Sequence, residues 1–466
     1  MNRHAHTTLS KDDLIELLRA EVAALTARLA ELERRLGLNS GNSGKPPSSD
    51  GLKKPPRTRS LRQPSGRKTG GQKGHKGETL RQVAEPDATV DHFPEACAHC
   101  ASALTEAMAT GHSARQVFDL PEPRPLIVME HRAHRCRCGK CGAQTRGSFP
   151  ADVTAPVQYG RRIMATAAYL RQYHLLPEDR LAELMGDLFG VKLVPATIAR
   201  MSRGCARRFQ RFVDMVCERV KTARVKHMDE TGFRIGGKLQ WLHIASTALL
   251  TFYRVSAKRG SLLPGVLGIV VHDHWKPYYT MQGVLHALCN AHHLRELQAL
   301  IEIEKEDWAL RMQRLLRRAC HATNLARDRE VALKPNLIAL FVRNYDAIVA
   351  EGIAFHEAQP PLAAKRRGRR RRRTGHNLLL RLEGRKDDVL RFLTDATVPF
   401  TNNQAERDGR MAKLKQKISG GFRSQEGAHD FAIIRSLIST AKKQDWNVIQ
   451  TLMQPPETLI ERLCTA

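Results

Sequence analysis

The sequence predicts a multidomain α+β protein. Its length of 466 residues fits about three domains at roughly 150 residues each. Hydrophobic residues make up 42% of the chain, which is enough for at least one large core and argues against wholesale disorder. Along the chain, a helical periodicity gives way to a basic Pro- and Gly-rich stretch, then to helices, to β-patterned runs and to helices again. This mixture of patterns decides the fold class.

The charge of the chain indicates a polyanionic partner. Lys and Arg number 76 against 47 Asp and Glu, a formal net charge of +29, and nucleic acid is the first candidate. No stretch approaches about 18 apolar residues, and the first residues carry charges where a signal peptide has an apolar run. We therefore expect a soluble intracellular chain with no membrane partner. Clustered cysteines in such a chain indicate metal ligands rather than disulfides.

Residues 10–37 have the pattern of one amphipathic helix. The stretch Ser10–Asp13 resembles a capping box, and apolar positions then alternate in steps of four and three. This spacing is an a/d seam of fewer than three heptads, which favours a short coiled coil and, with it, a homo-oligomer. The alternative is a helix docked on the chain's own core. The seam consists of Leu18, Val22, Leu25, Leu29, Leu32 and Leu36.

The next segment, residues 38–90, is rich in Pro, Gly, Ser, Lys and Arg and cannot bury enough apolar surface to fold alone. Its GGQKGHKG stretch (Gly70–Gly77) lacks the spacing and the Lys-Ser/Thr ending of a phosphate-binding loop. We interpret the segment as a basic flexible arm that follows DNA phosphates, with a plain solvated linker as the alternative.

Two C-x-x-C motifs lie in residues 91–150. Cys97 and Cys100 form the first and Cys138 and Cys141 the second, and four thiolates close a tetrahedral structural Zn²⁺ site. The stretch between the motifs has room for a strand pair, for which Leu126–Arg132 is the candidate. The alternative is a pair of reduced thiol turns. Substitute ligands for the fourth position are Cys136, His99 and His134.

Residues 151–222 have a helical pattern. A helix over Pro177–Phe189 that ends at Gly190, followed by a helix from Pro195, resembles a helix-turn-helix whose second helix offers side chains to DNA. A purely structural helical pair fits the same pattern. The side chains available to DNA are Thr197, Arg200 and Arg203.

A β pattern begins after Arg224. A short run that ends at Asp229 and two further runs predict a three-stranded meander, and a near-continuous apolar run then predicts a central strand buried on both faces. We place an α/β core at 223–300 and 396–445, a basic helical insertion at 301–395 and a C-terminal helix at 446–466. The expected strands are Val225–Met228, Leu239–Ser246, Leu249–Val255, Val266–Val271 and Val284–Cys289.

Three acids in this core are candidates for a metal site. Asp229 ends the first predicted strand and Asp273 follows the fourth, so in a ribonuclease-H-like strand order both carboxylates reach one sheet edge. Glu406 lies in the first turn of a helix that can pack there. Such hard oxygen donors suit Mg²⁺ or Mn²⁺, and two ions about 4 Å apart promote phosphodiester displacement. Arg410 and Lys413 share the helix face of Glu406 and can hold a DNA phosphate.

For each acid alone, the plainer interpretation is a solvated side chain, a strand end or a partner of the helix dipole. Other acids occupy similar places in the sequence and are not selected. They are Glu230, Asp408 and Glu426.

Together these residues resemble a known family, the DDE transposases of the insertion-sequence-66 type (the large TnpC-like protein). The resemblance implies a ribonuclease-H-like catalytic core in which Asp229, Asp273 and Glu406 are the catalytic triad, Mg²⁺-dependent cleavage at transposon ends, and strand transfer by a freed 3′-hydroxyl. It also implies a bacterial, cytoplasmic, nucleoid-associated protein that binds double-stranded DNA, with accessory proteins of the same element. Four stretches in order carry it: GLNSGNSGKPPSSD with GGQKGHKG, the paired C-x-x-C motifs, HMDETGF through VVHDHWKPYY, and TNNQAERDGRMAKLKQKISGGFRS.

Two further features go with the resemblance. Family members carry a Cys or Trp and then a His near LCNAHHLREL, which selects His292 as an auxiliary residue at the scissile phosphate or, alternatively, as a core histidine. We expect the dense Arg run of the insertion, which includes Arg369, Arg370 and Arg371, to contact DNA, with a solvated loop as the alternative. The remaining functional alternatives are a ribonuclease-H-like nuclease without transposition and a zinc-containing DNA-binding regulator.

Overall fold

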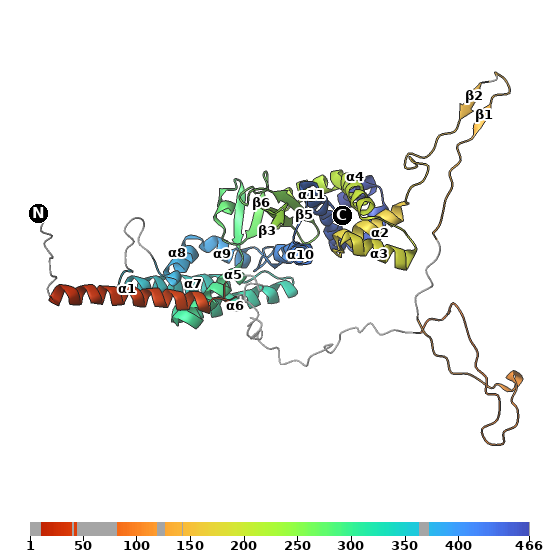
Figure 1. The fold of residues 1–466 in the computed structure, drawn as a ribbon. Coiled ribbons are helices and arrows are strands. Elements are labelled where there is room, and N and C mark those ends of the chain that lie inside the picture. Colours follow the sequence, from red (N-terminus) through yellow and green to blue (C-terminus); the bar gives the residue numbers. More distant parts are fainter. Residues whose placement is uncertain are drawn as a thin grey trace, which may run out of the picture. The chain divides into compact units, whose positions relative to one another are not determined.

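The computed structural model describes residues 11–39, 42–43, 82–118, 126–141, 143–362 and 372–465 (Figure 1). The chain divides into two compact units. The smaller comprises Lys53–Ile127 and Leu188–Gly190, and the larger comprises Met1–Leu52, Val128–Asp187 and Val191–Ala466. A five-stranded sheet with helices around it lies in the larger unit, so the protein is mixed α+β, as the sequence predicts.

The sheet is mixed. Its strand order is β5-β4-β3-β6-β7, in which β3, β4 and β5 form the predicted antiparallel meander, and β6 and β7 extend the sheet in parallel with β3. Gly268, at φ +76°, lets β6 begin so close to β3 that an added Cβ would lie 2.7 Å from the Arg224 carbonyl oxygen. The strands are β3 (Val225–Ile235), β4 (Lys238–Ser246), β5 (Thr251–Ser256), β6 (Gly268–His272) and β7 (Val284–Leu288).

The first strand of this sheet is longer than the sequence predicts. The expectation that it ends at Asp229 is wrong, because antiparallel pairing with β4 continues as far as Ile235 opposite Lys238. Parallel pairing of β3 with β6 nevertheless stops at His227. Asp229 therefore lies just beyond the parallel part of the sheet, which is the position that the predicted metal site requires.

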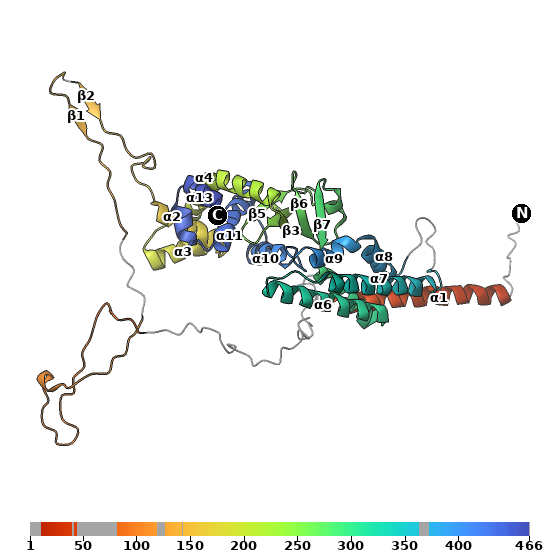
Figure 2. The same ribbon diagram turned by 180° about the vertical axis from the view of Figure 1, so that it is seen from behind.

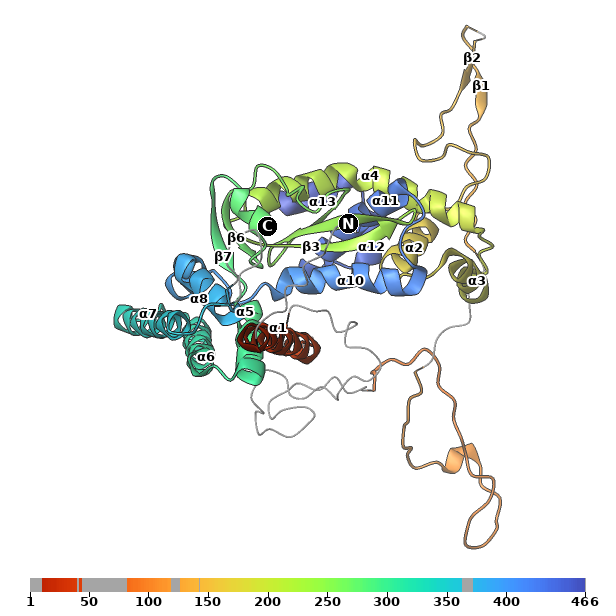
Figure 3. The same ribbon diagram turned by 60° about the vertical axis from the view of Figure 1, so that its left-hand side comes forward.

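Side chains of β3 alternate between two covered faces, with α4 on one side of the strand and α10 on the other (Figure 3). Met228 packs with apolar side chains of α4, and Phe233 packs with alanines of α10. Asp229 has the same parity as Phe233 and points to the α10 face, whereas Glu230 has the parity of Met228. The covering helices are α4 (Pro195–Thr222), α10 (Asn403–Ser419) and α11 (Gln425–Lys443), the last of which contributes to both faces.

Further helices surround α4. The predicted helices before and after Gly190 are present, and their apolar faces pack on one another. The sequence predicts one helix after Trp446, but this expectation is wrong. Two helices follow, because Pro455 and Pro456 interrupt the backbone hydrogen bonding of a single helix. These elements are α2 (Arg161–Gln172), α3 (Glu178–Phe189), α12 (Val448–Met453) and α13 (Pro456–Thr465).

The insertion between the second and third acids is helical, as predicted. Its helices bury Trp308, Leu316 and Tyr345 in one cluster, which continues onto β6 and β7 through Val271 and Leu288. The insertion is therefore anchored on the parallel half of the sheet. Its elements are the π-helical turn η4 (Leu300–Glu304), α6 (Asp307–Asp328), α7 (Pro335–Glu357), α8 (Thr374–Gly384) and α9 (Lys386–Thr394), and α5 (Asn290–Ala299) of the core leads into them. Figure 2 shows α9 beside β7.

The N-terminal helix α1 (Lys11–Gly37) covers almost the predicted range. All six residues of its apolar seam are exposed, and pairing with a second helix stays a prediction. Asn42 is buried and donates hydrogen bonds to the Gly37 carbonyl (2.9 Å) and to Glu302 of η4 (3.0 Å). The end of α1 thus contacts the insertion. Most of the predicted arm and the predicted DNA contacts Arg369, Arg370 and Arg371 lie outside the described residues.

Two acids lie together where η4 meets α6. Glu306 is buried, accepts a hydrogen bond from the Trp308 indole (2.7 Å) and contacts His356 (3.2 Å). Burial, followed by repulsion from Glu306, raises the pKa of Glu304 to about 7, while Arg34 and His356 act in the opposite direction. Glu304 therefore holds a proton in the folded chain at pH values where the unfolded chain has lost it.

Replacing Glu304 with Gln should stabilise the protein at high pH. Because the folded-state pKa of Glu304 is raised, the wild type loses stability as pH increases from the ordinary Glu pKa to about 7. We expect the melting temperature of Glu304→Gln to exceed that of the wild type by about 2–4 °C at pH 8 and to match it at about pH 4. Glu383→Gln, which changes an exposed acid of the insertion, is the control. Equal melting temperatures of Glu304→Gln and wild type at pH 8 contradict the prediction.

Candidate active site

The parallel strands β3 and β6 carry two of the predicted acids to one edge of the sheet. Asp273 is the first residue after β6, and its carboxylate accepts a hydrogen bond from the Trp275 backbone N–H (2.9 Å). Asp229 faces α10, where an added Cβ on Gly409 would lie 4.0 Å from Asp229 Oδ2. This is an ordinary van der Waals distance, so the backbone of α10 at Gly409 passes directly beside the carboxylate.

Asn402 fixes where α10 begins. Its side-chain amide donates to the Met228 carbonyl (2.8 Å), and its amide oxygen lies 2.9 Å from His227 Nδ1. Its backbone N–H donates to Cys289 Sγ (3.1 Å), between β7 and α5. Asn402 is 1% exposed, so water replaces none of these bonds. They hold the first turn of α10, which carries Glu406, against β3. Sequence reasoning missed Asn402, and the N-cap signal would not have found it, because its side chain bonds to β3 and not to the first turn of α10.

Electrostatic repulsion links the three predicted acids. Burial, then repulsion from Glu230, Asp273 and Glu406, raises the pKa of Asp229 to about 8. Burial raises the pKa of Asp273 as well. Among the described residues, no Lys or Arg nitrogen lies within 4.0 Å of the Asp229, Asp273 or Glu406 carboxylates. Three acids without a paired cation are an unfavourable arrangement that a hard divalent cation relieves.

The three carboxylates lie in one region but do not form a tight cluster. Their oxygens are close enough to perturb one another, yet they do not all lie within 4.8 Å of one another. In the described part of the chain, the three side chains that meet this limit are Cys289, His292 and Glu406. The structure therefore gathers Asp229, Asp273 and Glu406 in one region, and Glu406 turns toward α5.

Of the two predicted DNA contacts on α10, one lies near the acids. Lys413 Nζ donates to the Gly232 carbonyl of β3 (3.1 Å), and the charge of Asp229 partly offsets the burial that lowers the pKa of Lys413. Arg410 is exposed on the same helix. Both side chains stay predicted DNA contacts.

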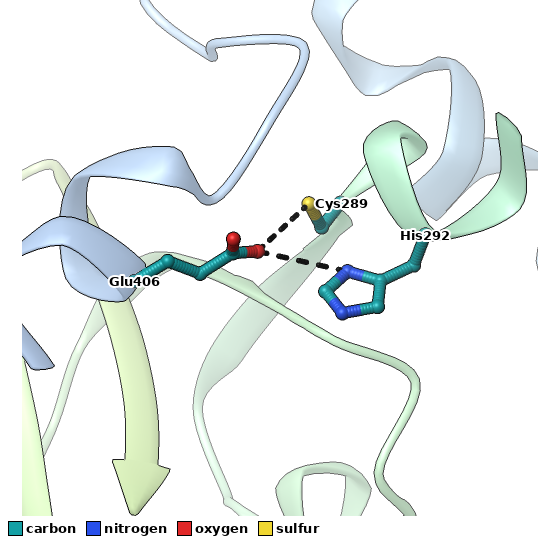
Figure 4. Close-up of side chains that lie close together, drawn as sticks. All are labelled: Cys289, His292 and Glu406. Atoms are coloured by element: carbon teal, nitrogen blue, oxygen red, sulfur yellow. Dashed lines mark hydrogen bonds and ion pairs between the residues drawn. The ribbon is translucent and has the colours of Figure 1, made fainter. Parts of the chain in front are cut away.

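The junction of β7 and α5 places a thiol and an imidazole beside Glu406 (Figure 4). The Cys289 thiol lies 3.9 Å from Glu406 Oε1, and His292 Nδ1 lies 3.8 Å from the same oxygen. Burial, then the Glu406 charge, raises the pKa of Cys289 to about 12. Burial, then Arg295 and Arg381, lowers the pKa of His292 to about 4. Its neighbour His293 is a core histidine, buried and bonded to Asn290, and an auxiliary role of His292 stays a prediction.

Comparison with known protein families matches residues 156–430 to the Transposase IS66 family. The chain belongs to the IS66 transposase family. The matched region is more than half of the chain and contains the whole five-stranded sheet and the three acids. Residues 5–81 match a family of unknown function, DUF6444.

One curated relative of this chain is "Uncharacterized protein y4jO" of Sinorhizobium fredii. The two are 39% identical over 92 residues, which is 18% of this chain and 29% of that protein. The match therefore spans less than a third of the relative's length. Within the described residues of the transposase, no helix combines the length and the apolar character needed to cross a membrane.

The acids that the sequence analysis does not select each have a partner side chain in this protein. Glu230 lies on the opposite face of β3 from Asp229, where it pairs with Arg259 (2.6 Å) and accepts a hydrogen bond from the Tyr278 hydroxyl (2.6 Å). The Arg259 guanidinium lies between two indoles, 5.1 Å from the Trp241 ring centroid and 4.1 Å from that of Trp275. The charge of Arg259 also counteracts the raised pKa of Asp273. Arg259 is thus a site residue that the sequence alone did not indicate.

The other two unselected acids form ion pairs away from the site. Asp408 pairs with Lys443 (2.9 Å) and accepts a hydrogen bond from the Thr251 hydroxyl (3.2 Å). Glu426 pairs with Arg203 (2.8 Å), one of the residues predicted to face DNA. Arg200 is exposed and donates to the Thr197 hydroxyl (3.4 Å), so a helix-turn-helix function of α3 and α4 stays a prediction.

Each C-x-x-C motif forms a tight turn. In the smaller unit, the Cys97 N–H donates to the Ser102 carbonyl (2.9 Å), and hydrogen bonds with Ser102 lower the pKa of Cys100. In the larger unit, the Cys138 N–H donates to the Ala143 carbonyl (2.8 Å), and the backbone N–H groups of Cys141 and Lys140 lower the pKa of Cys138. Lowered thiol pKa values favour the thiolates that Zn²⁺ binds, and the shared Zn²⁺ site stays a prediction.

The strands near the second motif are not those expected. The proposal of a strand pair near Leu126–Arg132 is wrong for the described residues of that stretch, which contain no strand. The antiparallel pair is β1 (Arg135–Arg137) with β2 (Gln144–Arg146), because the Cys138–Cys141 turn itself joins the two strands.

Replacing Asn402 with Ala should destabilise the transposase. The change leaves the buried Met228 carbonyl and the His227 ring without partners, which we expect to lower the free energy of unfolding by about 2 kcal/mol in chemical denaturation. The neighbouring Asn403 is exposed, so Asn403→Ala is a matched control that should change stability by less than about 0.5 kcal/mol. Equal effects of the two substitutions would show that the hydrogen bonds of Asn402 do not hold α10.

Replacing Arg259 with Ala should destabilise the protein. Glu230, whose side chain is 1% exposed, would keep a buried negative charge without its cationic partner. We expect a loss of about 2 kcal/mol in the free energy of unfolding at pH 7. Glu230→Gln introduced into the Arg259→Ala variant should recover part of this loss, since the double variant buries no unpaired charge. A double variant as unstable as the sum of the single variants would contradict the pairing.

Proposed function

We propose that this chain is a DDE transposase that cleaves DNA at insertion-sequence ends and joins the freed 3′-hydroxyl to target DNA, with Mg²⁺ or Mn²⁺ held by Asp229, Asp273 and Glu406. One observation carries the proposal. The three acids come from β3, from the end of β6 and from α10. Burial, then repulsion from neighbouring acids, raises the pKa of Asp229 to about 8. Among the described residues, no Lys or Arg nitrogen lies within 4.0 Å of the three carboxylates. This donor set fits a hard divalent cation, whereas Glu230, Asp408 and Glu426 already have cationic partners.

The sheet supports a ribonuclease-H-like core. Three antiparallel strands followed by two parallel ones, in the order β5-β4-β3-β6-β7, bring the end of the parallel part of β3 beside the carboxyl end of β6. Functional residues of sheets with parallel strands gather at the carboxyl ends of those strands. Asp229 and Asp273 occupy this edge, and Asn402 brings Glu406 to it.

When bound, the metal ions stabilise the charge that develops on the attacking and leaving oxygens of the phosphodiester. The chain's own residues have other tasks. Lys413, beside Asp229, and the exposed Arg410 are placed to hold DNA phosphates. Trp275 N–H orients the Asp273 carboxylate. A pKa of about 4 makes His292 a poor general base at neutral pH, so we assign it no proton transfer and keep it as an auxiliary residue at the scissile phosphate.

The other parts of the chain are assigned to DNA binding and assembly. The net charge of +29 supports contact with double-stranded DNA, to which the arm, the Arg run and α4 would contribute. We propose that Cys97, Cys100, Cys138 and Cys141 hold a structural Zn²⁺. The exposed apolar seam of α1 supports a homo-oligomer, which fits a reaction that joins two DNA ends. Action in the bacterial cytoplasm at the nucleoid, with accessory proteins of the same element, belongs to the same proposal.

The test uses labelled DNA that carries one element end joined to flanking sequence, incubated with the full chain in Mg²⁺. We expect nicking and strand transfer by the wild type and a loss of at least about a hundredfold for Asp229→Asn and Glu406→Gln, since even outer-shell partners of metal ligands contribute about 10- to 100-fold. Glu426→Gln changes an exposed carboxylate and should keep full activity.

The outcomes separate the proposal from its alternatives. Nicking without strand transfer would indicate a nuclease. DNA binding without cleavage in Mg²⁺ or Mn²⁺ would indicate a DNA-binding regulator. Equal cleavage by wild type and Asp229→Asn would show that the three acids do not form the catalytic site.

A further inference from the structure

The cluster of Cys289, His292 and Glu406 contains a buried nitrogen without a hydrogen-bond partner. His292 Nδ1 is inaccessible to solvent and makes no hydrogen bond, although it lies 3.8 Å from Glu406 Oε1 (Figure 4). That separation is too long for a hydrogen bond. Native proteins rarely leave a buried polar atom in this condition, and such an atom calls for an explanation.

The spacing of the three ligand atoms offers a reason why His292 Nδ1 has no hydrogen-bond partner. Cys289 Sγ lies 3.9 Å from Glu406 Oε1, and all three ligand atoms lie within 4.8 Å of one another. A tetrahedral Zn²⁺ with ordinary bond lengths places sulfur and oxygen about 3.6 Å apart and nitrogen and oxygen about 3.4 Å apart. The observed separations exceed these values by a few tenths of an ångström. A gap of this size between three ligand atoms is suitable for one transition-metal ion.

We propose that Cys289, His292 and Glu406 form a second cation site, selective for a Zn²⁺-class ion, that shares Glu406 with the proposed Mg²⁺ site. A thiolate and an imidazole prefer such an ion to Mg²⁺, which takes oxygen ligands. As the ion binds, the S–H bond of Cys289 breaks and its proton leaves to water. The Asn402 N–H, 3.1 Å from Sγ, then donates to the bound thiolate.

The elements that carry the ligands favour this site. Cys289 directly precedes α5, and His292 lies in its first turn, so the two share one helix face. Glu406 lies in the first turn of α10, which Asn402 ties to the same junction. The His292 and Glu406 side chains are 28% and 26% exposed, which leaves a route for the ion and for a water ligand at the fourth position.

The site has a regulatory consequence that rests on the proposed function. An ion held by Cys289 and His292 occupies Glu406 and withdraws it from the Mg²⁺ centre. Zn²⁺ should therefore inhibit DNA cleavage in the presence of Mg²⁺. Binding itself depends on the three side chains alone and holds whether or not the chain cleaves DNA.

The binding test uses the full chain freed of transition metals and then titrated with Co²⁺ in Mg²⁺-containing buffer, so that the C-x-x-C thiols contribute equally to wild type and variants. We expect the wild type to bind one more Co²⁺ than Cys289→Ser, with stronger thiolate-to-cobalt charge-transfer absorption. His292→Ala should weaken this binding at least about tenfold. Cys320→Ser, which changes another partly buried thiol, is the matched control and should bind Co²⁺ as the wild type does.

Two outcomes overturn the proposal. One is equal Co²⁺ uptake with the same spectrum in wild type and Cys289→Ser. The other, which decides the matter if Cys289→Ser does not fold, is unchanged Co²⁺ affinity in His292→Ala. Asp229→Asn separates the two sites, because it should abolish cleavage and retain the extra Co²⁺. A wild type that binds this Co²⁺ but never cleaves DNA would refute the proposed function and leave the Zn²⁺-class site standing.

Discussion

One buried residue, Asn402, carries the contacts that bring three separate elements of this protein together. Its side-chain amide bonds to the Met228 carbonyl on β3 and to the His227 ring beside it, and its backbone N–H bonds to the Cys289 sulfur before α5. The Met228 carbonyl and the His227 ring are buried, so the cost of losing the side-chain amide falls on both at once. The position of Glu406 relative to Asp229 therefore depends on hydrogen bonding more than on apolar packing, since α10 offers the sheet mainly alanines.

The acids of the core divide according to the faces on which they lie. Strand alternation sends Glu230 to one side of β3, where Arg259 and Tyr278 compensate its charge. It sends Asp229 to the other side, where its near neighbours include Asp273 and Glu406. Arg and Lys side chains pair with Glu230 and Asp408 and not with Asp229, Asp273 or Glu406. The sheet edge that carries these three acids therefore attracts positive charge.

Much of the fold could be predicted from the sequence because periodicity reports local structure. The meander, the parallel strands, α4 and α10 all follow apolar patterns that a single segment carries, and Asp229, Asp273 and Glu406 were selected by their places on those segments. The predicted end of β3 was wrong. The length of this strand depends on its pairing with β4, which the local sequence pattern does not show. Asn402 and Arg259 were missed for a related reason. Their roles arise from partners that are distant in the sequence and can be read only from the folded chain.

The order of the elements along the chain has a consequence for synthesis. Asp229 and Asp273 precede the helical insertion, whereas Asn402 and Glu406 follow it, and Glu406 lies 177 residues after Asp229. At about 5–20 residues per second, a ribosome needs roughly 10 to 35 seconds to cover that interval. Throughout it, the nascent chain lacks the helix that carries the third acid. Under the proposed function, a polypeptide still in translation therefore cannot cut the DNA from which its own message is transcribed until the insertion has been made.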